Sequence, residues 1–118
     1  MKTENAIRDK SFAFALRVIK CYKYLQTEQK EYVLSKQFLR SGTAIGALVM
    51  EAEQAESKAD FIHKLAIALK EANETQYWLE LLYQSAYIDK NGYENILKDC
   101  VELLKLLTTI IKTSRSSR

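Results

Sequence analysis

The scarcity of chain-bending residues constrains the fold of this sequence more than any other feature. Its 118 residues contain no proline and only three glycines. A β-rich domain of this length needs many tight turns, which depend on those two residue types. A few long helices need very few turns, and glycine and proline both disfavour helix interiors. Since 47% of the residues are apolar, the chain can also bury a core. The sequence therefore predicts an all-α fold.

Four segments carry apolar residues at helical spacing. They cover about residues 5–27, 32–55, 58–87 and 93–112, and residues 113–118 are expected to form a flexible tail. Short connections between long helices favour antiparallel neighbours, so we expect one up-down-up-down four-helix bundle over residues 1–118. Ser57 and Asp60 have the spacing of a helix N-cap. The segment 89–92 predicts a turn, because Asn-Gly tolerates a positive φ.

The same spacing assigns an inward face to each helix. Inward positions include Phe14, Val18, Cys21, Phe38, Ile45, Val49, Leu65, Ala72, Leu79, Ala86, Cys100, Leu107, Thr108 and Ile111. In the second helix, Gly42 and Gly46 are four residues apart, which suggests a close approach to another backbone. That backbone could belong to the same bundle or to a second copy.

Two helices carry apolar residues that the core cannot cover. At 100° per residue, these side chains lie roughly opposite the inward stripe of their helix. They are Phe12, Leu16 and Ile19 on the first helix and Ile67, Trp78 and Leu81 on the third. We expect these six residues to form an oligomer interface, because a second copy would cover them. The alternative is a wide core with scattered surface apolar residues, which are common.

The positive charge is concentrated at the two ends of the sequence. The net charge is +3, and residues 1–28 and 90–118 each carry an excess of three basic residues. In the predicted bundle the first and last helices are neighbours, so their charges could merge into one positive face that binds phosphates. Candidate contacts are Arg17, Lys20, Lys23, Arg40, Lys98, Lys105 and Lys112. The alternative is a solvated face with Lys98–Glu102 type pairs.

No arrangement of residues recommends an active site. Di-iron bundles need two Glu-x-x-His motifs, but this chain has one histidine, His63, predicted to point outward. The cysteines, Cys21 and Cys100, are predicted to point inward and away from it. The three glycines are isolated and form no phosphate-binding loop. We therefore expect no catalytic residues, no metal and no cofactor.

The expected compartment is the cytoplasm. The first residues lack the apolar run of a secretory signal, and no stretch approaches the roughly 18 apolar residues of a membrane span. Two cysteines on inward faces do not resemble a secreted disulfide framework. We expect no membrane partner.

Two motifs in the middle of the chain resemble a known family. The first is Gln37-Phe38-Leu39-Arg40-Ser41-Gly42-Thr43-Ala44-Ile45-Gly46-Ala47, followed by Glu51-Ala52. The second is Asp60-Phe61-Ile62-x-Lys64-Leu65, then Ala68-Leu69-Lys70-Glu71-Ala72-x-Glu74-Thr75 and Trp78-Leu79. The chain resembles the bacterial four-helix bundle proteins encoded in intervening sequences of large-subunit (23S) ribosomal RNA genes, a family related to the accessory protein of diversity-generating retroelements.

The resemblance implies an up-down bundle that assembles into a ring, a homopentamer, and it implies no catalytic residues. For relatives it implies nucleic-acid contact through a positive surface. The combined hypothesis is a non-enzymatic homo-oligomer that binds RNA or DNA without strong sequence preference. The alternative is a scaffold that docks another protein and does not touch nucleic acid. Arg40 fits either hypothesis, as a phosphate contact or as an interface residue paired with Glu51 or Glu71 of a neighbour.

Overall fold

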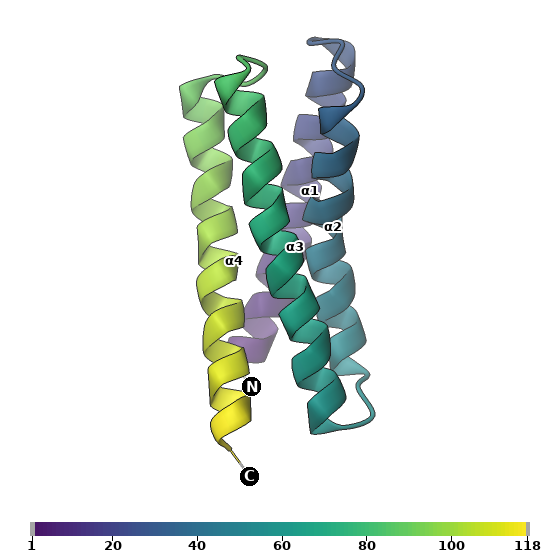
Figure 1. The fold of residues 1–118 in the computed structure, drawn as a ribbon, viewed down its shortest axis with the longest axis vertical. Helices are drawn as coiled ribbons and strands as arrows, with labels where there is room; N and C mark the ends of the chain where they lie inside the picture. The colour runs from purple at the N-terminus through teal and green to yellow at the C-terminus, as the bar shows by residue number, and fades with distance from the viewer. Residues whose placement is uncertain (1, 118) are drawn as a thin grey trace.

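The computed structural model describes residues 2–117, and these residues form an all-α four-helix bundle (Figure 1). The helices are α1 Lys2–Thr27, α2 Leu34–Glu53, α3 Lys58–Gln84 and α4 Lys90–Ser116. They run up, down, up and down, as the sequence predicts, and the bundle is 50 Å long. Met1 and Arg118, which belong to the predicted bundle and tail, lie outside the described residues.

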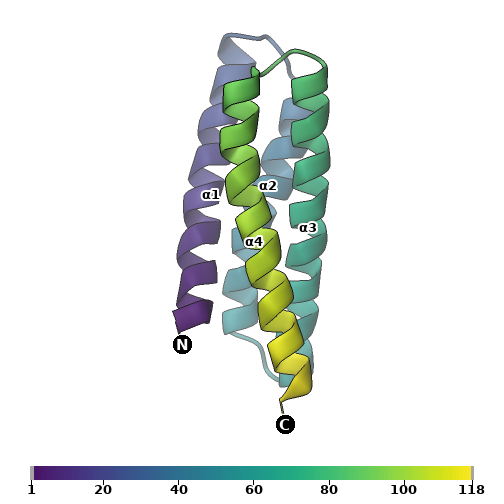
Figure 2. The same ribbon diagram turned by 90° about the vertical axis from the view of Figure 1, so that its left-hand side faces the viewer.

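Each helix packs against two neighbours. Helix α2 lies beside α1 and α3, and α4 lies beside α3 and α1, whereas the backbones of the described parts of α1 and α3 do not approach each other closely. Helices α1 and α3 therefore occupy diagonal corners of the bundle (Figure 2). The connections α1–α2 and α3–α4 lie together at one end, and α2–α3 lies at the other end with the two termini (Figure 1).

The core runs along the axis and contains most of the predicted inward residues. Fully or almost fully buried side chains include Phe14, Val18, Phe38, Ile45, Leu65, Leu79, Cys100 and Leu107. Two predictions are wrong, since Thr108 and Ala86 are exposed. Thr108 lies about 100° around the helix from the buried Leu107 and is therefore turned out of the core. Ala86 lies beyond the end of α3, in the connection to α4.

The α3–α4 connection differs from the predicted Asn-Gly turn. The positive φ belongs to Ala86, at 66°, directly after the α3 C-cap Ser85. The backbone N–H of Tyr87 donates to the carbonyl of Leu82, which closes the helix end in a Schellman-type arrangement. Asn91 and Gly92 form the first turn of α4, and Gly92 does not adopt a positive φ. The prediction failed because Asp89 acts as an N-cap and its carboxylate accepts from the Gly92 N–H at 2.7 Å.

The start of α3 and the end of α4 are well defined by hydrogen bonds. Ser57 is the predicted N-cap, and its Oγ accepts from the Asp60 N–H at 3.0 Å. Helix α4 extends to Ser116, whereas the sequence predicts a flexible tail from residue 113. The Ser116 hydroxyl donates to the Thr113 carbonyl, and Lys58 of α3 donates to Ser117. These contacts hold the last turn against the beginning of α3.

Glycine allows α1 and α2 to approach closely. A Cβ atom on Gly42 would lie 2.8 Å from Cγ2 of the buried Val18, inside van der Waals contact. A Cβ atom on Gly46 would lie 3.4 Å from the Ser11 carbonyl oxygen, which is a tight but tolerable distance. The sequence-based expectation of a close approach is thus met within one bundle, with α1 as the partner.

Glu31 caps the start of α2, a role that the sequence analysis does not predict. It lies in the α1–α2 connection, and its carboxylate accepts from the N–H groups of Val33, Leu34 and Ser35 at 2.7–3.0 Å. Burial opposes ionisation, but the three backbone donors outweigh it and hold the pKa of Glu31 below its usual value. The side chain therefore replaces the missing hydrogen-bond partners of the first α2 turn.

The glycine contacts predict opposite outcomes for two similar substitutions. Gly42→Ala should lower the free energy of unfolding by about 1–2 kcal/mol, because overpacking against Val18 outweighs the gain in helix propensity. Gly46→Ala, the matched control, should be neutral or stabilising by up to about 1 kcal/mol. Urea unfolding followed by circular dichroism, at one protein concentration, measures both. Equal effects would contradict the difference in packing.

The Glu31 cap predicts a pH-dependent contribution to stability. Since the pKa is lower in the folded chain, the stabilisation is complete above the unfolded value of about 4.3 and is lost as the pH falls through the folded value. Glu31→Gln should cost about 1 kcal/mol at neutral pH, and its difference from wild type should shrink below about pH 4. Glu28→Gln, an exposed control in the same connection, should change little. A constant Glu31→Gln difference at all pH values would refute the role.

Candidate assembly and nucleic-acid surfaces

An apolar groove runs along the outer seam between α1 and α2. Its volume is about 670 Å³, and the residues that line it include the small residues Ala15, Gly46 and Ala47. Phe12 and Met50 line the groove and are 65% and 64% exposed. The groove forms because the residues at the close α1–α2 contact are small, so their side chains do not fill the outer side of the seam.

The predicted interface residues of α1 lie at this groove. Phe12 and Ile19 line it, and Leu16 is 54% exposed on the same outer side of α1. Met50 was missed by the sequence analysis. Helical spacing places it about 140° from Ile45, towards the side of Gly46 and α1, so the same geometry could have identified it.

The predicted interface residues of α3 form a separate surface. Ile67, Trp78 and Leu81 are all partly buried, and Trp78 packs against the core. Trp78 Nε1 donates to a Glu74 carboxylate oxygen at 2.9 Å, and Tyr77 contacts the Trp78 ring edge-on. Because α1 and α3 occupy diagonal corners, the six predicted residues belong to two surfaces on different sides of the bundle.

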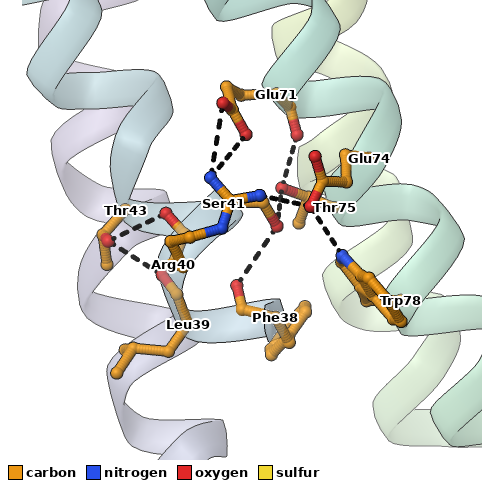
Figure 3. A network of polar contacts seen from close by, with 9 residues as sticks. All are labelled: Phe38, Leu39, Arg40, Ser41, Thr43, Glu71, Glu74, Thr75 and Trp78. Carbon is orange, nitrogen blue, oxygen red and sulfur yellow. Dashed lines mark hydrogen bonds and ion pairs between the residues drawn. The ribbon is translucent and has the colours of Figure 1, made fainter. Parts of the chain in front are cut away.

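Arg40 is part of a polar network between α2 and α3 (Figure 3). Its guanidinium lies 3.3 Å from Glu71 and also forms an ion pair with Glu74. The pKa of Glu74 is lowered, because the hydrogen bond from the Trp78 N–H stabilises its charged form and Arg40 adds a smaller effect in the same direction. Beneath these charges, the buried hydroxyls of Ser41 and Thr75 form a hydrogen bond of 2.9 Å.

This network engages Arg40 within its own chain. Glu71, one of the two carboxylates considered as a partner in a neighbouring copy, is an intramolecular partner here. The other, Glu51, pairs with Lys64 at 3.0 Å. Two carboxylates share one guanidinium, so the local charge is negative and does not favour a phosphate at Arg40.

The basic residues at the α1–α4 seam are also paired. Arg17 forms an ion pair with Asp99 and a hydrogen bond to the Asn95 side chain at 3.2 Å. Lys10 pairs with Glu102 at 3.1 Å, so Glu102 is engaged across the seam and not with Lys98. The expected merging of α1 and α4 charges is therefore reduced, because acidic residues of α4 neutralise the seam.

Five of the seven candidate phosphate contacts remain available. They are Lys20, Lys23, Lys98, Lys105 and Lys112, all exposed, and no carboxylate of residues 5–117 lies within 4 Å of their amino groups. Lys98, Lys105 and Lys112 are seven residues apart and form a line along α4 with steps of about 10.5 Å. The structure thus separates the candidates into paired arginines and unpaired lysines.

The cysteines have the properties of core residues. Cys100 is buried and its Sγ lies 3.4 Å from the Ala72 carbonyl, and burial raises its pKa to about 12. Burial also raises the pKa of Cys21 to about 11, although Arg17 opposes the shift. Neither thiol forms a thiolate at neutral pH, so neither is an activated nucleophile.

Residues with metal-binding side chains are dispersed. His63 is exposed on α3. Within the described part of the chain, no three His, Cys, Asp or Glu side chains are grouped in a way that could hold a metal ion. None of the described helices is both long and apolar enough to span a membrane.

Sequence comparison identifies the family. The sequence model for the 23S rRNA-intervening sequence protein matches residues 3–109, which is most of the chain. The chain belongs to this family. The match covers both motifs and reaches into all four helices, so the resemblance to this family is confirmed.

A solved structure supports the same family. It is the crystal structure of a protein of unknown function from the S23 ribosomal protein family of Bacteroides thetaiotaomicron VPI-5482. The two sequences are 60% identical, the match covers 93% of this chain and 98% of the other, and the TM-score is 0.93. A search of curated proteins found no significant match.

Proposed function

We propose that this family member is a non-enzymatic, homo-oligomeric bundle that binds RNA or DNA through its unpaired lysines. The observation that carries the proposal is the apolar groove between α1 and α2, whose rim residues Phe12 and Met50 are largely exposed. Exposed apolar surface of this kind favours a protein interface. The raised pKa values of Cys21 and Cys100 support a role without nucleophilic catalysis.

The position of the apolar surfaces favours assembly beyond a simple pair. The groove on α1 and α2 and the Trp78 surface on α3 face different sides of the bundle. If one copy docks its α3 surface into the groove of the next, each copy uses two different patches, and such contacts close into a ring or form a filament. A ring of five copies is the assembly that the family resemblance implies.

The unpaired lysines support the nucleic-acid-binding part of the proposal. Phosphate binding needs cations that are not already neutralised, and this condition separates the exposed lysines from Arg17 and Arg40. In an oligomer the lysines of several copies act on one nucleic acid, so their contributions add. Such contacts do not read base sequence.

A protein scaffold is the second candidate function. The same groove could receive an amphipathic helix of another protein in place of a second copy. The two functions differ in their response to salt. Phosphate binding weakens steeply as counterions are added, whereas a docked apolar helix does not.

The groove predicts how assembly responds to a single charge. Leu16→Glu should lower the mass of the particle measured by light scattering, because a carboxylate on the exposed apolar side of α1, beside the groove, would be desolvated in the interface. The helical signal should remain, since Leu16 is more than half exposed in the single bundle. Thr109→Glu, an exposed control on α4, should leave the mass unchanged. A wild-type chain that is already monomeric would refute assembly.

The unpaired lysines predict a measurable salt dependence. The logarithm of the nucleic-acid affinity should fall linearly with the logarithm of salt concentration. Combined replacement of Lys20, Lys23, Lys98, Lys105 and Lys112 by glutamine should reduce that slope by roughly 0.7–0.9 for each lost phosphate contact. Lys64→Gln is the control, because Lys64 is paired with Glu51. Absence of binding at low salt would reject the nucleic-acid function and leave the scaffold.

A further inference from the structure

Lysines and tyrosines alternate through the end of α1 and the connection to α2. The series runs Lys20, Tyr22, Lys23, Tyr24, Lys30, Tyr32 and Lys36. All four lysines are exposed, and no carboxylate of residues 5–117 pairs with them within 4 Å. Tyr24 and Tyr32 are 43% and 49% exposed, whereas Tyr22 is partly buried. This segment therefore presents two accessible aromatic rings among four free cations.

The fold places this segment at one end of the bundle. The α1–α2 and α3–α4 connections lie side by side there, away from both termini (Figures 1 and 2). The second connection adds the exposed Lys90 at the start of α4. Tyr24 and Lys20 line a shallow depression with Ile88 and Gly92, so the last turns of α1 and the α3–α4 connection with the start of α4 contribute to one surface.

The acidic residues at this end are largely occupied by the backbone. Glu31 is buried and accepts three N–H groups of the first α2 turn. Asp89 accepts the Gly92 N–H at the start of α4. Both carboxylates therefore act as helix caps, although Asp89 stays exposed, as do Glu28 in the α1–α2 connection and Glu94 at the start of α4. The exposed lysines at this end outnumber these exposed acids, so its accessible charge is positive on balance.

One of the rings is also held in position. The Gln29 side chain donates to the Tyr24 hydroxyl at 2.7 Å. The next residue, Lys30, has a φ of 54°, a left-handed conformation that is unfavourable for lysine. This turn directs the chain from the end of α1 to Glu31 and α2. The hydrogen bond from Gln29 fixes the hydroxyl of Tyr24, while a large part of the Tyr24 side chain stays accessible.

We propose that this end of the bundle is a stacking site for single-stranded nucleic acid. Tyr24 and Tyr32 stack on unpaired bases, and Lys20, Lys23, Lys30 and Lys36 contact the phosphates between them. The inference rests on the proposed nucleic-acid function and adds the strand type and the place of binding. Aromatic rings can stack on any base without reading sequence, but a duplex does not offer the faces of its bases.

The test compares strand types and ring chemistry by fluorescence anisotropy at low salt. The probes are short labelled oligo(U), oligo(dT) and a DNA duplex of equal length. The double variant Tyr24→Ala/Tyr32→Ala should bind both single strands at least about tenfold more weakly than wild type. Tyr24→Phe/Tyr32→Phe keeps the rings and should bind like wild type. Gln54→Ala removes an exposed polar side chain from the opposite end of the bundle, at the end of α2, and should have no effect.

Salt dependence separates stacking from phosphate contacts. The tyrosine-to-alanine variant should keep the wild-type salt slope, whereas Lys23→Gln/Lys30→Gln should reduce it by roughly 0.7 per lost contact. Ultraviolet cross-linking of wild-type protein to oligo(U), followed by peptide mapping, should label the segment that contains Tyr24 and Tyr32. This measurement does not depend on the folding of any variant.

Four results would overturn the inference. They are equal affinity for the duplex, loss of binding in the phenylalanine variant, unchanged binding in the alanine variant, and cross-links confined to other helices. In each case salt-sensitive binding by the wild-type chain would still support the proposed function. If the wild-type chain binds no nucleic acid at low salt, the proposed function fails, and this inference fails with it.

Discussion

The close contact between α1 and α2 determines much of the surface of this molecule. Val18 occupies the space that a side chain at position 42 would need, and the Ser11 carbonyl lies beside Gly46. Helices at such a short separation cannot place large side chains in the seam between them. The large residues Phe12 and Met50 therefore stand at the margins and enclose an apolar groove. The packing that stabilises the monomer thus also creates the surface most suited to a partner.

The charged residues also fall into two groups, those bonded within the bundle and those exposed to solvent. The carboxylates of Glu31 and Asp89 accept hydrogen bonds from backbone N–H groups. Arg17 and Arg40 form ion pairs with carboxylates of neighbouring helices. Each of these residues stabilises a helix end or a seam. The unpaired lysines have flexible side chains that remain in solvent, where they can meet an external anion. The formal charge of +3 therefore understates the positive character of the surfaces at which lysines gather.

The sequence predicted the fold because periodicity and the lack of turn residues both indicate long helices. It located Val18, Ile45 and Leu107 in the core, since each lies at the centre of an apolar stripe. The ends of the helices were harder to predict from the sequence, because each end depends on one or a few hydrogen bonds. The positive φ at Ala86 has no signal in its own residue type, and Asn91-Gly92 carries a strong turn signal that the Asp89 cap overrides.

The candidate surfaces were predicted in part for the same reason. Helical spacing gives the side of a helix on which a residue lies, so Phe12, Leu16 and the exposed lysines could be assigned to outer faces. It does not give the partner across a seam. The pairing of Arg40 with Glu74, and of Arg17 with Asp99, depends on the relative shift of two helices, which no single segment encodes.

The four seams of the bundle differ in how they are held. The α2–α3 seam contains the buried Ser41–Thr75 pair beneath its ion pairs, whereas α1 and α4 share the sparsest contact and are joined by Arg17–Asp99 and Lys10–Glu102. Exposed ion pairs weaken as ions screen them, but apolar contacts do not. The α1–α4 seam, with the fewest close backbone approaches, therefore relies more on its ion pairs than the α2–α3 seam does. Raising the ionic strength is expected to loosen the first and last helices from each other before it affects the two central ones.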